Sequence, residues 1–253
     1  MTVLAELVIG ADGRHSTVRT QAGLETLDLG APMDVLWMRL SRQPTDPEQT
    51  LGRIGAGRIF VMLNRGDYWQ CAFVIPKGGF EQVHRSGLPA LREEIVRLAA
   101  YLRDRVGELG DGSDIKLLTV TVDRLREWHR PGLLCIGDAA HAMSPIGGVG
   151  INLAVQDAIA AANILTPGLR RGEISDDDRH AVQRRREFPT RAMQAVQIFM
   201  QNRVIGRVLE STEKVSPPLP LRMLGRMPLL QRLPARLLGL GFRPEHVRIP
   251  AGT

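Results

Sequence analysis

The chain has 253 residues, of which 43% are hydrophobic and 24% charged, as in ordinary globular proteins. Its net charge is +6, but the arginines are spread along the sequence without an aromatic-studded basic strand, so we expect no nucleic-acid partner. No run of eighteen uncharged apolar residues occurs, which predicts no transmembrane segment. Glu6 interrupts the first apolar run, which argues against a signal peptide. Cys71 and Cys135 lie in apolar runs and are interpreted as core residues of a cytoplasmic protein.

The first predicted elements are a strand and a short helix. Residues 3–9 (VLAELVI) form an apolar run that ends at the sequence GADG, residues 10–13. Ser16 is then placed to cap a helix over residues 17–22, which Gly23 would terminate.

Residues 33–76 are predicted to form strands, because the runs VLWMRLS, RIFVMLN and DYWQCAFVI are rich in β-branched and aromatic residues. A turn over residues 64–67 separates the last two. Alternate residues of a strand share a face, and one face of the third run is predicted to pack in the core: Trp69, Cys71, Phe73 and Ile75. The other face of the third run either lines a cavity or meets solvent. The candidates for a cavity wall are Trp37 and Arg39 of the first run and Tyr68 and Gln70 of the third.

The next elements alternate between helix and strand. Apolar residues at three- and four-residue intervals predict a helix over 89–107, and the run IKLLTVTV predicts a strand over 115–122. Residues 133–136 form a short apolar run without alternation, as in a strand buried in a parallel sheet. A helix over about 150–165 follows. From 176 to about 211 the chain is helical in character, and a Leu/Arg/Pro-rich segment covers 219–241.

A glycine-rich turn, GDAAHAMSPIGGVG over residues 137–150, joins the short strand to its helix. Glycine is favoured where the backbone turns sharply or approaches a ligand. The helix N-terminus offers unpaired N–H groups and a partial positive charge. Asp138 stands at the strand end, where acidic residues of nucleotide-binding folds accept hydrogen bonds from sugar hydroxyls. These features favour a nucleotide-like ligand, although such turns also serve packing alone.

Two segments together resemble the class A flavoprotein monooxygenases, the para-hydroxybenzoate hydroxylase-like family. LVIGADGRHSTVR is similar to the family's DG motif, and LLCIGDAAHAMSPIGGVGINLAVQDA is similar to its GD motif. The fold that the resemblance implies is α/β (α+β). It comprises an incomplete Rossmann-like FAD-binding domain (1–30 and 116–170), an inserted antiparallel β-sheet substrate layer (31–115) and a helical C-terminal region (171–253).

The resemblance implies FAD as cofactor and NADH or NADPH as co-substrate. The implied reaction is hydroxylation of a small, aromatic substrate through a flavin hydroperoxide. By similarity, Asp138 would bind the ribityl hydroxyls, Pro145 would shape the cavity, and Asp12, Gly13 and Arg19 would link FAD to NAD(P)H use. The implied cofactor-binding set is completed by the glycine turn and the helix start: Gly137, Gly147, Gly148, Gly150, Ile151 and Asn152. His141 is interpreted as structural, no residue is assigned as catalytic, and no metal-ligand spacing occurs.

The family's G-x-G-x-x-G pyrophosphate-binding unit has no counterpart in the sequence. We therefore expect a monooxygenase lacking its N-terminal portion, with impaired FAD binding. Alternatives are a non-catalytic remnant or half of a split flavoprotein that needs a complementing N-terminal chain, and a reductase or halogenase on the same scaffold. A homo-oligomer is a further possibility.

Overall fold

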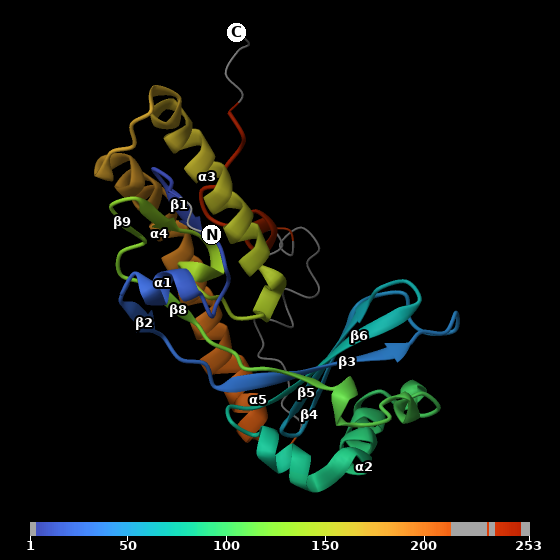
Figure 1. The fold of residues 1–253 in the computed structure, drawn as a ribbon. Helices are drawn as coiled ribbons and strands as arrows, with labels where there is room; N and C mark the ends of the chain where they lie inside the picture. Colours follow the sequence, from blue (N-terminus) through green and yellow to red (C-terminus); the bar gives the residue numbers. More distant parts are fainter. Residues whose placement is uncertain (1–3, 214–231, 233–235, 249–253) are drawn as a thin grey trace. The chain divides into compact units, whose positions relative to one another are not determined.

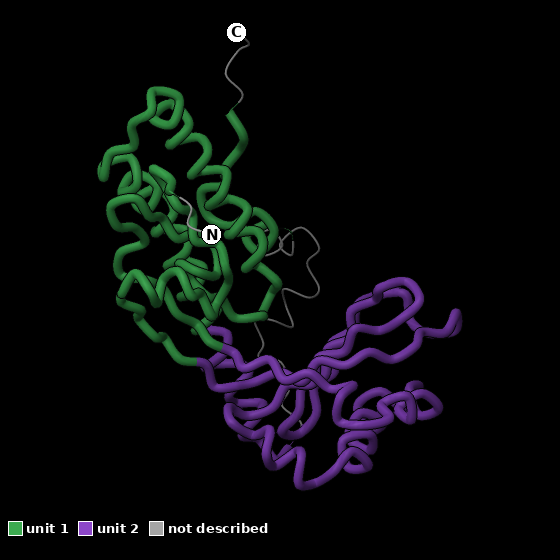
Figure 2. The backbone as a smooth tube through the Cα atoms, in the orientation of Figure 1, with its two compact units in different colours: residues 1–30, 121–198, 219–253 green, residues 31–120, 199–218 purple. Residues whose placement is uncertain are grey.

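The computed structural model describes residues 4–213, 232 and 236–248. The chain forms two compact units (Figure 2). Unit 1 comprises residues 1–30, 121–198 and 219–253, and unit 2 comprises residues 31–120 and 199–218. This division differs from the expected three parts, because residues 116–120 and 199–218 also belong to unit 2.

Unit 1 contains a small sheet with the strand order β1-β10-β9, and Figure 1 labels its two outer strands, β1 and β9. The strands are β1 (Val8–Gly10), β10 (Leu133–Cys135) and β9 (His129–Arg130). β1 is parallel to β10, with Ile9 opposite Leu134, whereas β9 is antiparallel. Within the described residues, the parallel neighbour predicted for β10 is therefore present on one side only. The strand expected over residues 3–9 is shorter than predicted and begins at Val8.

Helices cover this sheet. They are α1 (Thr17–Gln21), α3 (Gly150–Arg171) and α4 (Asp176–Met200), of which residues up to 198 belong to unit 1. A separate antiparallel pair joins β2 (Thr26–Asp28) to β8 (Asp123–Leu125). α3 extends beyond the predicted residue 165 and ends at Gly172, whose φ of 76° is the left-handed cap that glycine favours. Its buried residues share one face and pack into unit 1: Leu153, Ala160, Ala161 and Leu165.

Residues 146–171 are long and apolar enough to cross a membrane by length and composition alone. This segment consists of residues 146–149 of the glycine-rich turn, which we call the second glycine turn, together with α3. Leu165 and Ala161 belong to the hydrophobic core of unit 1 beside Leu134 and Trp128. That packing is typical of a core helix, so composition alone is weak evidence for a membrane span.

Unit 2 is built on a five-stranded antiparallel sheet with the order β4-β5-β6-β3-β7. The strands are β3 (Met33–Ser41), β4 (Leu51–Gly55), β5 (Arg58–Asn64), β6 (Tyr68–Pro76) and β7 (Lys116–Leu118). The three predicted β runs match β3, β5 and β6. β4 was not predicted, because its sequence LGRIG carries two glycines and an arginine and is largely exposed.

One face of this sheet packs against α2 (Phe80–Leu98) and the 3-10 turns η1 (Ala100–Leu102) and η2 (Val106–Glu108). A third 3-10 turn, η3 (Gly112–Asp114), precedes β7. The predicted core face of β6 is confirmed, since Trp69, Cys71, Phe73 and Ile75 are all at most 5% exposed. The helix expected over 89–107 begins earlier and ends at Leu98. Gly87 has a φ of 78°, which is not helical, and Pro89 follows two residues later. The helix is therefore kinked near the residue where it was predicted to begin.

Residues 201–210 add helical turns to unit 2. A π-helical turn, η6 (Gln201–Ile205), is followed by α5 (Gly206–Glu210), which lies beside β5 and β6. Both cysteines are free and buried, as predicted for core residues. Burial raises the pKa of the Cys71 thiol to about 12 and that of Cys135 to about 11.

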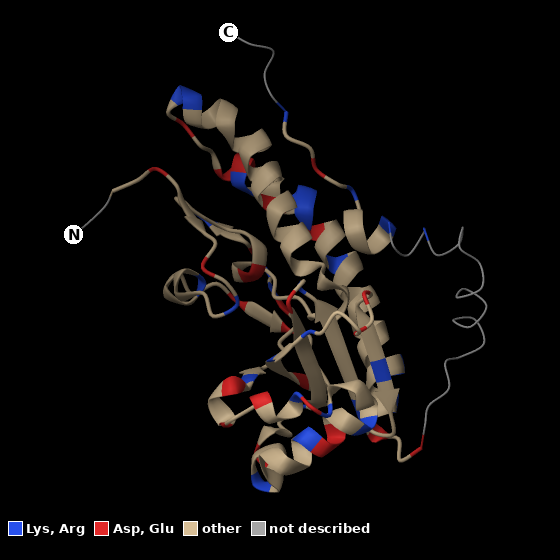
Figure 3. Cartoon of the chain, turned by 90° about the vertical axis from the view of Figure 1, so that its right-hand side faces the viewer, with Lys and Arg blue, Asp and Glu red and all other residues tan. Residues whose placement is uncertain are grey.

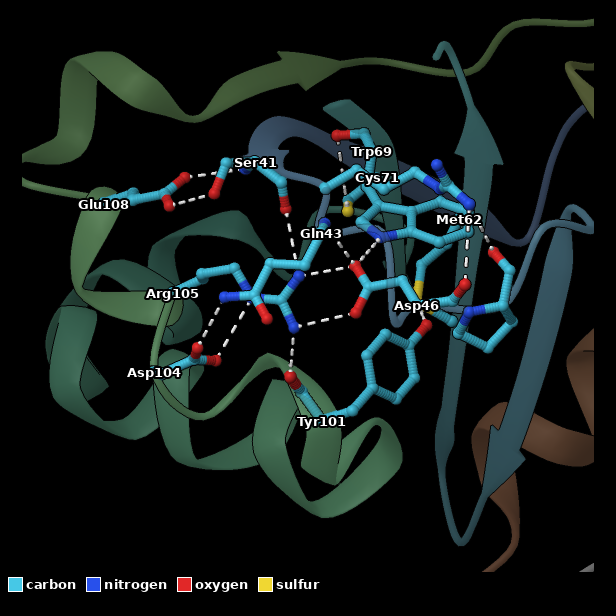
Figure 4. A network of polar contacts seen from close by, with 12 residues as sticks. Ser41, Gln43, Asp46, Met62, Trp69, Cys71, Tyr101, Asp104, Arg105 and Glu108 are labelled. Carbon is cyan, nitrogen blue, oxygen red and sulfur yellow. Dashed lines mark hydrogen bonds and ion pairs between the residues drawn. The ribbon is translucent and has the colours of Figure 1, made fainter. Parts of the chain in front are cut away.

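A buried ion pair fixes the loop between β3 and β4 to Arg105, the residue directly before η2 (Figure 4). The guanidinium of Arg105 donates to both carboxylate oxygens of Asp46, and the Trp69 indole donates to the same carboxylate at 2.9 Å. Burial alone would raise the pKa of Asp46, but the hydrogen bonds from Arg105 and Trp69 outweigh it and lower that pKa. This network anchors the loop that carries Asp46 to the core of unit 2.

Charged residues of both signs are interspersed in the view of Figure 3. Several are paired, for example Arg97 with Glu94 at 2.8 Å and Arg126 with Glu25 at 2.7 Å. Some of the individual positive charges are thus paired with a neighbouring carboxylate, as on solvated protein surfaces.

Candidate cofactor-binding site

The first part of the glycine-rich turn, residues 137–139, packs directly against α3. β10 ends at Cys135, and the chain turns through η4 (Gly137–Ala139). Gly137 is buried with a φ of 58°, and a Cβ added there would lie 3.0 Å from the Cβ of Ala154 on α3. Both the left-handed backbone and the close approach therefore require glycine at this position.

Asp138 follows at the carboxyl end of β10, and its side chain is 29% exposed. Arg14 donates to its carboxylate at 3.3 Å. A Cβ added to Gly150 would lie 3.8 Å from Oδ1 of Asp138. The carboxylate is therefore close to the N-terminus of α3, and the absence of a side chain at Gly150 leaves that approach open.

A cavity of about 460 Å³ lies beside Asp138. One wall is a single face of α3, because Ile151, Ala154, Val155 and Ala158 follow helical spacing. The opposite wall comes from the DG segment and the turn: Ala11, Gly13, Ile136, Gly137 and Asp138. Ile151 is 76% exposed and Val155 54%. Apolar walls with one carboxylate suit a ligand that has a flat or aliphatic body and a hydroxylated edge.

The second glycine turn shapes the start of α3. η5 (Ile146–Gly148) follows Pro145, and Gly147 and Gly148 have φ values of 75° and 63°. The φ of Gly150 is not in the left-handed region, so the backbone conformation does not require glycine there. The missing side chain instead leaves space near Asp138. The N-terminus of α3 has no side-chain cap. Its first N–H groups therefore keep the capacity to bind an anion or a polarised oxygen.

The DG segment is tied to the turn by side chains. Ser16 caps α1 by accepting from the Arg19 amide at 2.9 Å, as predicted. Asp12 accepts from the Val18 amide at 3.1 Å, and hydrogen bonding to Ser16 and to Val18 lowers the pKa of Asp12. The Arg19 guanidinium reaches the Asp123 carboxylate at 3.3 Å and the carbonyl of Ala139 at 3.5 Å. Asp12 and Arg19 thus have clear structural roles in this segment.

A fully buried network holds the turn from the other side. One carboxylate oxygen of Asp157, on α3, accepts from the Gly137 amide at 3.0 Å and from Nε2 of His141 at 2.6 Å. The other accepts from Nε of Arg186, on α4, at 2.9 Å. All three side chains are 0% exposed. Burial would raise the pKa of Asp157, but the neighbouring His141 and Arg186 outweigh it and lower that pKa.

His141 is held within this network. Its ring lies 4.9 Å from that of Trp128, and within the described residues Nδ1 has no hydrogen-bond partner. These contacts fit the structural role that the sequence indicates for His141. Asp157 and Arg186 were not predicted as members of a network. In each case the available signal was a charged residue on the buried face of its helix.

The structure separates the predicted site residues into three groups. Gly13, Gly137, Asp138 and Ile151 line the cavity. A second group surrounds the start of α3: Pro145, Gly147, Gly148, Gly150 and Asn152. Asp12 and Arg19 do not line the cavity and make the structural contacts described above. Arg14, which reaches Asp138, was missed because its position in the DG segment has no distinguishing pattern.

The proposed wall residues of unit 2 share one sheet face. Arg39 pairs with Gln70 in the β3–β6 register, and its guanidinium lies 4.0 Å from the centre of the Tyr68 ring. Arg39 also approaches the Asp67 carboxylate at 3.6 Å. Trp37, two residues before Arg39, lies on the same face.

Comparison with known proteins identifies the family. The family model described as "FAD binding domain" matches residues 1–196. The chain is 36% identical over 219 residues to the 6-methylpretetramide 4-monooxygenase of Streptomyces rimosus, covering 85% of this chain and 51% of that protein. The chain belongs to the FAD-dependent monooxygenases of class A.

Other relatives agree with this assignment. The 3-demethoxyubiquinol 3-hydroxylase of Escherichia coli is 26% identical over 174 residues, which is 68% of this chain and 43% of that protein. Among solved structures, PqsL, a probable FAD-dependent monooxygenase from Pseudomonas aeruginosa, superposes with a TM-score of 0.66 at 21% identity. The superposition covers 81% of this chain and 57% of PqsL. The chain spans about half the length of the curated relatives it matches.

FAD is the cofactor of this family, and the residues of the cavity fit it. Asp138 offers carboxylate acceptors for hydroxyl groups. Gly13 has a φ of 86°, and a Cβ added there would meet no atom within 4 Å, so backbone and ligand can approach each other at this position. The uncapped N-terminus of α3 favours electron-rich oxygens. Among the described residues, no group of three or more His, Cys, Asp or Glu side chains is arranged for a metal ion.

Proposed function

We propose that this chain contributes to an NAD(P)H-dependent hydroxylation of a small aromatic substrate, with FAD held in the cavity beside Asp138. The observation that carries the proposal is the partly exposed Asp138 carboxylate next to the uncapped start of α3. When bound, FAD supplies the transfer of electrons from NAD(P)H and the activation of oxygen. The names of two relatives, a 4-monooxygenase and a 3-hydroxylase, support this reaction class.

The residues of the chain have separate tasks in this proposal. Asp138 accepts hydrogen bonds from the ribityl chain, and Gly150, Ile151 and Asn152 present backbone N–H groups to the edge of the flavin ring. A helix N-terminus stabilises negative charge at such an edge by about 0.3–2 kcal/mol. The apolar face of α3, with Ile151 and Val155, excludes water from the cofactor.

Substrate recognition is assigned to the β3–β6 face of unit 2. Trp37 and Tyr68 offer aromatic surfaces for stacking, and Arg39 and Gln70 offer hydrogen-bond donors. We further propose that Gly13 and the neighbouring DG segment assist NAD(P)H use, and that the protein acts in the cytoplasm.

A second candidate function follows from the surface of unit 1. Within the described residues, β1 pairs only with β10, and Val8 and Ile9 are 47% and 43% exposed. An open strand edge beside an apolar helix face favours a further polypeptide segment at that edge. In this case the chain would bind FAD tightly only with a complementing polypeptide, or as a homo-oligomer.

The test is to titrate the purified chain with FAD by flavin fluorescence and then follow oxidation of NADH and of NADPH with phenolic substrates. The proposed function predicts saturable FAD binding and a product that gains one oxygen atom, seen by mass spectrometry. Saturation that appears only after adding a G-x-G-x-x-G-containing βαβ unit of a relative would favour the second candidate. No saturation by FAD, even after adding a G-x-G-x-x-G-containing βαβ unit of a relative, would contradict both.

A further inference from the structure

The described C-terminal residues 236–248, which we call the C-terminal strap, lie along α3 in unit 1. Residues 236–240 form a helical turn that ends at Gly241, whose φ is 70°. The side-chain amide of Asn152 donates to the carbonyl of Gly239 at 3.1 Å, and the side-chain amide of Gln156 donates to the carbonyl of Leu240 at 3.0 Å. Two side chains one turn apart on α3 thus cap the last carbonyls of the strap's helical turn.

The strap also contacts the second glycine turn. A Cβ added to Gly147 would lie 3.1 Å from Cδ2 of Leu238. Leu238 and Phe242 pack against a buried cluster at the start of α3: Met143, Val149, Leu153 and Met193. Leu238 is therefore seated on the turn that leads into the N–H groups proposed to face the flavin.

The far part of the strap reaches the buried network. Arg186, which holds Asp157, donates from Nη1 to the carbonyl of Arg243 at 3.3 Å. Glu245 lies 4.0 Å from the same nitrogen and forms an ion pair with Arg185. Asn163 fastens the end of the strap by donating to the carbonyl of His246 at 2.9 Å and accepting from the Arg248 amide at 3.0 Å.

We propose that the C-terminal strap is a positioning element of the FAD site, with Leu238 as its principal positioning residue. Asn152 and Gln156 follow directly after Ile151 and Val155 in sequence, so they lie about 100° around α3 from the cavity-lining face. The strap therefore runs beside the cavity and not across it. Leu238 holds the turn over residues 147–150 closed, and the turn in turn sets the direction of the first N–H groups of α3. This inference rests on the proposed function only in its effect on FAD.

The test compares Leu238→Ala with Leu240→Ala in the full chain. Both changes remove the same atoms from the same helical turn, but the Leu240 side chain is 47% exposed and is outside the cluster. Hydrogen exchange of the Gly148 amide, which donates to the Pro145 carbonyl at 3.2 Å, reports on the turn without any cofactor. Fluorescence titration with FAD, extended to millimolar concentrations, reports on the site, and the thermal midpoint reports on the fold.

The proposal predicts that Leu238→Ala speeds exchange of the Gly148 amide by about tenfold or more and weakens FAD binding by about tenfold, while the Leu240→Ala values stay within about twofold of the parent. Unchanged exchange in Leu238→Ala would overturn the positioning role. Faster exchange with unchanged FAD affinity would overturn the link to the cofactor site. If the parent chain binds no FAD, the link to the cofactor site fails, whereas titration with an added βαβ unit still decides the proposed function and the exchange data decide whether the strap holds the turn.

Discussion

Asp138 is the residue on which the proposed cofactor site depends most. We expect Asp138→Ala to weaken FAD binding by about 1.5–3 kcal/mol, because a charged acceptor of hydroxyl hydrogen bonds is lost. Fluorescence titration of the variant beside Asp177→Ala, an exposed acidic residue in the first turn of α4, measures the difference. Equal FAD affinity in the two variants would remove Asp138 from the site.

Gly147 and Gly150 differ in the reason for being glycine. Gly147 has a φ of 75° and faces Leu238, so Gly147→Ala should destabilise the fold by about 1–2 kcal/mol. Gly150 is helical, and an added Cβ makes only ordinary contacts, at 3.5 Å from Met143. Gly150→Ala should therefore leave stability unchanged or raise it by up to about 1 kcal/mol. Chemical denaturation of both variants checks the contrast, which would fail if the two variants were equally stable.

At the scale of elements, the Asp157–Arg186 pair joins α3 to α4 and holds the amide of Gly137. Removing either partner leaves the other buried charge without its ion-pair partner on the facing helix, so Asp157→Leu and Arg186→Leu should each cost about 3–5 kcal/mol of unfolding free energy. The double variant should cost clearly less than the sum, because both charges are then absent. Urea unfolding of the four proteins gives the coupling, and additive losses would mean that the pair is not a unit.

The Asp46–Arg105 pair fixes a loop of unit 2 and makes its stability depend on pH. The folded-state pKa of Asp46 is lowered below the unfolded value of about 3.9. Its contribution to stability is therefore complete above that value and is lost as the pH falls through the lower, folded pKa. We expect Asp46→Asn to lower the thermal midpoint at pH 7 far more than at pH 3.

Asp104 provides the control for this prediction, because it also contacts Arg105 but its side chain is 58% exposed. Asp104→Asn should change the midpoint much less at pH 7. A parallel shift of the Asp46→Asn midpoint at both pH values would show that ionisation of Asp46 is not the cause.

At the scale of the whole molecule, unit 1 presents an open cavity, a strand edge and exposed apolar side chains. Val8, Ile9, Ile151 and Val155 are each more than 40% exposed. We expect the 253-residue chain, purified alone, to carry substoichiometric FAD at micromolar concentrations and to self-associate. Light scattering with simultaneous absorbance at visible wavelengths measures both properties. A monomer with one FAD per chain would show that the GD and DG segments suffice.

Local patterns along the chain determine much of this protein by themselves. Alternation in β6 indicates which face enters the core, and the DG and GD segments, as family motifs, indicate FAD. Both conclusions depend on short spacings along the chain, which local geometry makes visible. Ser16 as the cap of α1 and Asp138 at the end of β10 belong to the same class, since each position is defined by its immediate neighbours.

Only the tertiary structure decided the partners that come from distant parts of the chain. The Arg14–Asp138 contact spans 124 positions and the Asp157–Arg186 contact 29, and no periodicity links them. The predicted Leu-rich segment over 219–241 lies largely outside the described residues, but its last part and the residues up to 248 lie on α3. The physical reason is that a single sequence shows which residues must be buried or capped, whereas the choice among many chemically equivalent partners is made by packing in three dimensions.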